Sequence, residues 1–206
     1  MARAPTIRSL FATQIYRAEL GPGLNTALER ACVAIAGDDG AGQDWSADNG
    51  YAGYTSYASL NDLVWRDPDF AALVDRIDPH VGAFAKACDF DLGGGRLALD
   101  SLWINILEPG GAHSGHIHPN SVISGTYYVS TPPGASALKI EDPRLPLMMA
   151  APPVRPRARL DNRRHVAIEP RPGTLLLWES WLRHEVPRNG AETARISISF
   201  NYRWDR

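Results

Sequence analysis

The segment GGAHSGHIHPNS (residues 110–121) contains three of the six histidines of this chain. In an extended segment, residues i and i+2 project from the same face, so His116 and His118 direct two imidazoles at one point. Two adjacent imidazoles can form a pair of metal ligands, although imidazole suits Fe, Zn, Cu and Ni and does not name the metal. The H-x-H pair is a weak motif by itself, because a single histidine is more often a surface or hydrogen-bonded core residue.

A further histidine, His184, strengthens the metal interpretation. It follows the apolar run GTLLLW (residues 173–178) and precedes Asn189-Gly190, a dipeptide that strongly favours a β-hairpin. Reflection through a two-residue turn would place His184 opposite Arg195 on the neighbouring strand, and a longer loop would shift the partner by a residue or so. The sequence therefore predicts a third metal ligand beside an arginine.

The last predicted strand has one polar and one apolar face. The polar face holds Arg195, Ser197, Ser199, Asn201 and Arg203, and the other holds Ile196, Ile198, Phe200, Tyr202 and Trp204. An ordinary sheet would turn the polar face to water. If His184 instead points into a barrel, Arg195 points there too and needs an anionic partner such as a carboxylate, because an unpaired buried charge is costly.

Helices are expected in the first half of the chain. One covers 24–36 and ends at Gly37, and a second begins at Asp67-Pro68 and runs to Cys88, with Pro79 as a kink or a division. An early strand over 7–18 and a long irregular loop over 37–59 complete this half.

Strands dominate the second half. After three consecutive glycines come short runs rich in β-branched and aromatic residues, separated by Pro/Gly turns, at residues 96–108, 121–130, 136–141, 165–169, 173–178 and 194–204. Helices followed by many strands predict an α+β, mainly β protein with a C-terminal sandwich or barrel. Residues 143–164 are rich in Pro and Arg and are interpreted as a surface loop, or alternatively as a basic lip over the site. This segment and 37–59 are the expected substrate-facing loops.

The bulk properties exclude several classes of partner. The 206 residues suit a single domain over 1–206, with 1–95 as N-terminal strand and helical support and 96–206 as the β core. A net charge of −2 does not argue for nucleic acid or for an anionic membrane surface. No run of about 18 apolar residues occurs. Cys32 and Cys88 form no paired motif, so a cytoplasmic protein is expected, and a homodimer is left open.

The motifs taken together resemble the Fe(II)/2-oxoglutarate-dependent oxygenases, and most closely a bacterial subfamily with the signature H-x-H-P-N-S-x-x-S-G-x-Y-Y-V. Residues 116–129, HIHPNSVISGTYYV, carry that signature. The segments from Gly173 to His184 and from Arg195 to Asn201 match its second half, and NGYAGYTSY (residues 49–57) resembles another of its regions. The resemblance covers 103–202 strongly and the N-terminal half weakly.

The resemblance implies a double-stranded β-helix (jelly-roll) core over 96–206, with the N-terminal helices packed on one sheet. It implies Fe(II) held by His116, His118 and His184, with His118 in the place where most of the superfamily has Asp or Glu. It implies 2-oxoglutarate as cosubstrate, whose distal carboxylate would pair with Arg195. The further residues implied to contact the cosubstrate are Ser197, Tyr128, Asn105 and Asn201. The expected reaction is hydroxylation, by O₂, of a small-molecule or peptidyl substrate.

Two alternatives remain beside this family. A cupin-like three-histidine dioxygenase would use no 2-oxoglutarate, and Gly110, His116 and His118 fit the start of a cupin motif. Val122 and Ile123 stand where that motif expects its glutamate, and His184 lies eleven positions beyond Gly173. The other alternative is a metal- or ligand-binding jelly roll without catalysis.

Overall fold

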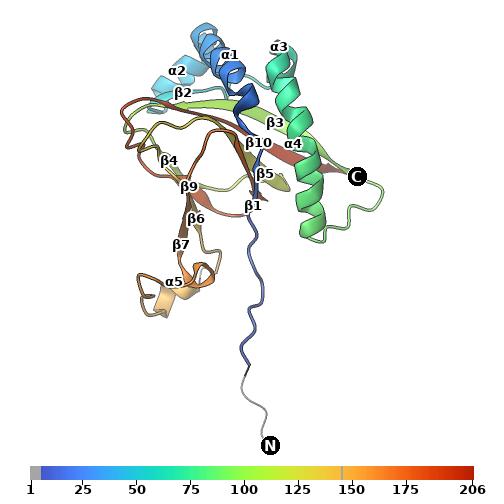
Figure 1. Ribbon diagram of the computed structural model, residues 1–206, viewed down its shortest axis with the longest axis vertical. Coiled ribbons are helices and arrows are strands. Elements are labelled where there is room, and N and C mark those ends of the chain that lie inside the picture. Colours follow the sequence, from blue (N-terminus) through green and yellow to red (C-terminus); the bar gives the residue numbers. More distant parts are fainter. Residues whose placement is uncertain (1–5, 145) are drawn as a thin grey trace, which may run out of the picture.

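Two antiparallel sheets form the body of the protein in the computed structural model, which describes residues 6–144 and 146–206 (Figure 1). The larger sheet has the strand order β1-β8-β5-β10-β3-β2, and the smaller has the order β4-β9-β6-β7. The strands are β1 (Tyr16–Glu19), β2 (Gly53–Thr55), β3 (Arg96–Leu107), β4 (His113–His116), β5 (Ile123–Ser130), β6 (Leu138–Glu141), β7 (His165–Ile168), β8 (Thr174–Glu179), β9 (His184–Val186) and β10 (Arg195–Asp205). The six strands predicted for the second half are all present, and the α+β, mainly β class is confirmed.

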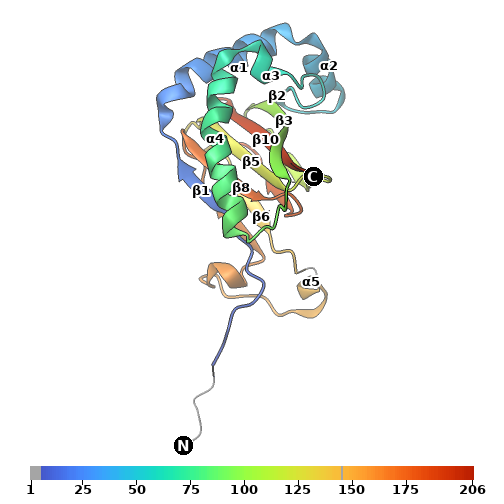
Figure 2. The ribbon, with the colours of Figure 1, turned by 90° about the vertical axis from the view of Figure 1, so that its right-hand side faces the viewer.

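Helices cover the outer face of the larger sheet (Figure 2). The helices of the first half are η1 (Pro22–Leu24), α1 (Asn25–Asp38), α2 (Gly40–Asp48), α3 (Leu63–Arg66) and α4 (Pro68–Ala87). Two short helices, α5 (Leu147–Ala150) and η2 (Leu160–Asn162), lie elsewhere, between β6 and β7 in the chain. The predicted start of α4 is confirmed, because the Asp67 side chain accepts a hydrogen bond from the backbone N–H of Asp69. Pro79 lies inside α4 and does not divide it. Gly37 does not end α1, which continues to Asp38.

The two faces of β10 have different environments, as its alternation predicts. Ile196, Ile198 and Phe200 join the core that the larger sheet forms with α1 and α4. Arg195, Ser197 and Asn201 are also buried, on the face that turns toward the smaller sheet, where they line a cavity. The polar face is therefore covered by the second sheet and not turned to water, which agrees with the barrel alternative in which Arg195 points inward.

The region 37–59 was expected to be an irregular loop, and this is wrong. It contains α2, whose N-terminus is capped by the Asp39 side chain, and the short strand β2, which pairs with β3. Gly53 allows this pairing: its φ is +124°, and a Cβ there would stand 2.0 Å from the Ile106 carbonyl oxygen. The early strand predicted over 7–18 is also shorter than expected, since β1 begins at Tyr16.

The predicted hairpin through Asn189-Gly190 is wrong as well. Strand β9 pairs with β4 and β6, whereas β10 pairs with β3 and β5, so the link between them crosses from one sheet to the other. A type I′ turn needs positive φ at both central residues, and neither Asn189 nor Gly190 has it. The Asn189 amide instead donates to the Leu107 carbonyl at 2.9 Å, which fastens the link to the end of β3.

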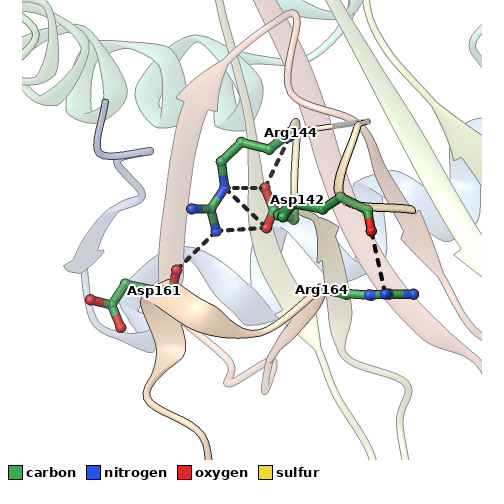
Figure 3. Close-up of polar contacts among 5 residues, drawn as sticks. Asp142, Arg144, Asp161 and Arg164 are labelled. Carbon is green, nitrogen blue, oxygen red and sulfur yellow. Dashed lines mark hydrogen bonds and ion pairs between the residues drawn. The ribbon is translucent and has the colours of Figure 1, made fainter. Parts of the chain in front are cut away.

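The described residues of 143–164 extend from the β6–β7 pair, away from α1–α4 (Figures 1 and 2). Arginines hold this excursion together (Figure 3): Arg144 pairs with Asp142 at 2.8 Å and donates to the Asp161 carbonyl at 3.0 Å. Arg164 donates to the Ala151 carbonyl at 3.1 Å. Among the described helices, none is long and apolar enough to cross a membrane.

Candidate metal centre

Three histidines converge between the two sheets. His116 ends β4 and is paired with His184 at the start of β9, so backbone pairing brings these two rings together. His118 lies beyond the end of β4, where its backbone N–H donates to the Ser180 carbonyl at 3.0 Å. One ligand nitrogen from each of the three rings lies within 4.8 Å of the other two. The H-x-H segment therefore delivers both rings to one point, although only its first histidine is on a strand.

Backbone carbonyls fix the orientation of two of these rings. His116 Nδ1 lies 2.7 Å from the Ser114 oxygen, and His184 Nδ1 lies 2.8 Å from the Leu182 oxygen. A carbonyl can only accept, so each Nδ1 is the donor and each Nε2 is the nitrogen left for a metal. Metal-binding histidines are commonly oriented in this way.

The distances between the rings suit a shared cation. His118 Nε2 and His184 Nε2 are 3.3 Å apart. Two nitrogens that each lie about 2.1 Å from one ion are roughly 3 Å from each other. Burial is the main cause that lowers the pKa of His118 to about 3 and that of His184 to about 4, with the neighbouring histidines adding to the effect. Both imidazoles are therefore neutral near pH 7, the form that binds a metal.

Arg195 lines the same cavity. Its guanidinium is buried, and no described Asp or Glu forms an ion pair with it. Its side chain is 3% exposed, and its guanidinium carbon lies 5.1 Å from the centre of the Tyr128 ring. Among the described residues, none accepts from Arg195 Nε or Nη1, and none bonds the Tyr128 hydroxyl. A buried charge without a partner is costly, so this arrangement favours an anionic ligand.

The cavity that joins these groups has a volume of about 1190 Å³. The predicted site residues that line it are His116, His118, His184, Arg195, Ser197, Asn105 and Asn201. Tyr128 does not itself line the cavity, but its ring packs against the Arg195 guanidinium. Of the two expected substrate-facing loops, 37–59 contributes to the lining, but no described residue of 143–164 does.

The two predicted asparagines already have protein partners. Asn105 accepts from the Thr55 hydroxyl at 3.0 Å and donates to the Ser199 hydroxyl oxygen at 3.1 Å. Asn201 accepts from the Ser124 hydroxyl at 2.7 Å and donates to the Ser101 hydroxyl oxygen at 3.1 Å. These bonds tie neighbouring elements together along the cavity wall, and a contact to the cosubstrate stays a prediction for both residues.

Sequence reasoning missed one pair of residues in the cavity. His113 Nε2 and the Tyr51 hydroxyl are joined by a hydrogen bond of 2.8 Å, and both residues line the cavity. His113 has the wrong parity to share a face with His116 in a regular strand. An irregularity in the pairing between His113 and His116 removes that restriction. The visible signals were a third histidine beside H-x-H and a tyrosine within residues 49–57.

Comparison with known proteins agrees with this geometry. The model of the family described as "Putative 2OG-Fe(II) oxygenase" matches residues 101–201, which contain the three histidines and Arg195. The chain belongs to the 2OG-Fe(II) oxygenase family. It is accordingly an enzyme that uses Fe(II) and 2-oxoglutarate, and this favours the oxygenase over the cupin-like and non-catalytic alternatives. The comparison with curated proteins gave no match.

Solved structures share the fold of this 2OG-Fe(II) oxygenase at low sequence identity. The carbocyclase SnoK from nogalamycin biosynthesis has a TM-score of 0.62 at 15% identity, over 92% of this chain and 79% of that one. HygX from Streptomyces hygroscopicus, with nickel and 2-oxoglutarate bound, has a TM-score of 0.59 at 13% identity, over 92% and 81%. A Pseudomonas putida prolyl-4-hydroxylase has a TM-score of 0.55 at 13% identity, over 93% and 94%. These likenesses confirm the double-stranded β-helix fold.

Proposed function

We propose that this 2OG-Fe(II) oxygenase holds Fe(II) through His116, His118 and His184, binds the distal carboxylate of 2-oxoglutarate with Arg195, and hydroxylates its substrate. The observation that carries the proposal is the buried Arg195, whose guanidinium has donors without a protein partner in the cavity of the three histidines. Three imidazole nitrogens suit Fe(II), and the free donors suit a carboxylate. The residues present therefore fit both groups.

Bound iron and 2-oxoglutarate supply the oxidation: O₂ hydroxylates a substrate C–H bond while 2-oxoglutarate becomes succinate and CO₂. The chain supplies position and a shielded cavity. Arg195 fixes one end of the cosubstrate through paired hydrogen bonds, and the Tyr128 hydroxyl adds a donor there. The described residues add no Asp or Glu to the group of three histidines, so His118 as ligand leaves the metal site one unit more positive than the usual carboxylate would.

The prime substrate is proposed to approach from the end of the cavity that lies away from Arg195. In the pairing of β10 with β3, Arg195 is opposite Leu107 and Ser199 is opposite Trp103. Four residues of strand separate these positions by about 13 Å. The Trp103 ring lies 5.8 Å from the His118 ring and 5.3 Å from the ring of Tyr57, which is 59% exposed. The metal site would therefore lie between a buried anion pocket and an aromatic mouth.

The proposal extends to the class of substrate and to the cellular location. The aromatic mouth suits a small-molecule or peptidyl substrate with an apolar group. Cys32 and Cys88 are free thiols, which fits the reducing cytoplasm. A homodimer stays open, and measuring the molar mass in solution would decide it.

An anaerobic titration tests the proposal. Fe(II) followed by 2-oxoglutarate is expected to give a visible charge-transfer band that needs both. Arg195→Ala should lower the affinity for 2-oxoglutarate, measured from this band, at least about tenfold, because it removes a charged hydrogen-bond partner. Arg157→Ala, which removes an exposed arginine outside the cavity, is the matched control and should leave it unchanged. Trp103→Leu should also keep the affinity for 2-oxoglutarate.

Each outcome of the titration is decisive. Tight Fe(II) binding with no spectral response to 2-oxoglutarate would contradict the proposed site. A band that is equally strong in Arg195→Ala would remove Arg195 from the cosubstrate pocket. Loss of 2-oxoglutarate affinity in Trp103→Leu would contradict the assignment of the two ends of the cavity.

A further inference from the structure

Tyr51 and His113 form a polar pair that the proposed mechanism has not used. Tyr51 lies in the connection between α2 and β2, and His113 begins β4. Their side chains are joined by the 2.8 Å hydrogen bond, and their rings meet edge to face with centres 5.2 Å apart. Both residues line the cavity, so the pair brings the N-terminal half of the chain to the site.

The pair lies near Arg195, because Leu107 in β3 is paired with Arg195 on one side and with Gly53, two residues after Tyr51, on the other. Burial is the main cause that raises the pKa of Tyr51 and lowers that of His113 to about 3. In each case the charge of Arg195 is the next cause, lowering both pKa values, and it also lowers the pKa of Tyr128. Tyr51 and His113 thus line one cavity with Arg195, and the Tyr128 ring lies against its guanidinium.

The hydrogen-bonding capacity of these groups suggests a direction for the Tyr51–His113 bond. A hydroxyl can donate once and accept twice, whereas a neutral imidazole donates from one nitrogen. If His113 carries its proton on Nε2, it donates to the Tyr51 oxygen and leaves the Tyr51 O–H free. Arg195 and Tyr128 already offer donors without a protein acceptor in the same region.

We propose that the Tyr51 hydroxyl, oriented by His113, is a third donor to the distal carboxylate of 2-oxoglutarate, beside Arg195 and Tyr128. His113 acts through Tyr51 and is a positioning residue. This inference rests on the proposed function of Arg195. It makes recognition of the cosubstrate depend on residue 51, which lies outside the segment 101–201 that matches the family model.

A purely structural role is the competing explanation, because the Tyr51 ring also packs against the apolar cluster that contains Leu107 and Val186. Two probes separate the explanations: 2-oxoglutarate and 2-oxopentanoate, which has a methyl group in place of the distal carboxylate. A contact to that carboxylate affects only the first probe, whereas a shift of the whole site affects both.

The experiment is calorimetric titration of both probes into anaerobic Fe(II)-loaded protein. Tyr51→Phe is expected to weaken 2-oxoglutarate binding about tenfold, the effect of losing one hydrogen bond to a charged group, and to leave 2-oxopentanoate unchanged. His113→Ala should weaken 2-oxoglutarate binding when Tyr51 is present and should add nothing in the Tyr51→Phe background. Tyr16→Phe, which removes the hydroxyl of a Tyr–His pair outside the cavity, is the matched control and should bind both probes as the parent does.

The outcomes distinguish this inference from the proposed function. If Arg195→Ala loses the preference for 2-oxoglutarate but Tyr51→Phe retains it, the role proposed for Tyr51 is wrong and the proposed function stands. Equal weakening of both probes in Tyr51→Phe would assign Tyr51 a structural role. If Arg195→Ala itself has no effect, the proposed cosubstrate site is wrong, and so is the role proposed for Tyr51.

Discussion

At the scale of single residues, the histidines differ in how the chain holds them. His116 and His184 have a backbone carbonyl on Nδ1 and face each other across a strand pair. His118 is outside the strand and packs 5.8 Å from Trp103. It is held by a backbone hydrogen bond to Ser180 and by ring packing.

Replacement of His118 tests whether the third imidazole is a ligand. Loss of an orienting partner alone typically costs 10–100-fold in metal affinity, so His118→Ala is expected to weaken Fe(II) binding by about 100-fold or more. His118→Asp, which supplies the commoner ligand, should retain most of the affinity. Anaerobic competition with a chelator measures both, with the exposed His165→Ala as control. Full iron affinity in His118→Ala would remove His118 from the ligand set.

At the scale of elements, short strands position the residues of the proposed site. Strand β2 has three residues, yet its pairing with β3 fixes the connection that carries Tyr51. Strands β4 and β9, of four and three residues, set the distance between His116 and His184. The long α4 helix stabilises the larger sheet from outside through residues such as Phe70 and Ile77, which are fully buried.

Gly53→Ala is expected to disturb the β2–β3 pairing. The positive φ would be strained by about 1–3 kcal/mol, and the new Cβ would meet the Ile106 carbonyl. The free energy of unfolding should fall by at least that amount, and 2-oxoglutarate should bind more weakly because Tyr51 moves. Gly50→Ala is the matched control: φ is +64° there, but a Cβ would meet nothing within 4 Å, so the cost should be about 1 kcal/mol. Denaturant unfolding measures both, and equal costs would contradict the role of the close approach.

At the scale of the whole molecule, the two sheets remove polar groups from water, and this couples the site to stability. His113, His118 and His184 all have pKa values lowered by burial, to about 3, 3 and 4. The unfolded chain takes up these protons near pH 6.5, whereas the folded metal-free chain does not. The unfolded state therefore binds more protons between pH 6.5 and 4, and low pH favours unfolding.

The metal-free protein is therefore expected to be most stable above pH 6.5 and to lose stability as the pH falls toward 4. The slope of the unfolding free energy against pH reports how many more protons the unfolded state binds than the folded state. His118→Asn should reduce that number by up to one in this range. Urea unfolding of metal-free protein at a series of pH values gives the slope. An unchanged slope in the variant would show that His118 titrates normally in the folded protein.

Local periodicity was enough to predict much of this protein. The alternation along residues 194–204 separated the polar from the apolar face of β10, and the H-x-H spacing paired His116 with His118, because side-chain direction in extended chain depends only on sequence separation. The Asp67-Pro68 cap and the strands of the second half are equally local signals. The family resemblance added iron and 2-oxoglutarate.

Only the tertiary structure decided which sheet each strand joins and what lies beside Arg195. The link at Asn189 crosses between sheets because its amide bonds Leu107, 82 residues away in sequence. His113 turns into the cavity through an irregular strand pairing, and Tyr51 meets it across 62 residues. Such contacts depend on how distant segments pack, which no local pattern encodes. The sequence alone therefore determined the donors and the faces that carry them, and packing decided which of them meet around one buried charge.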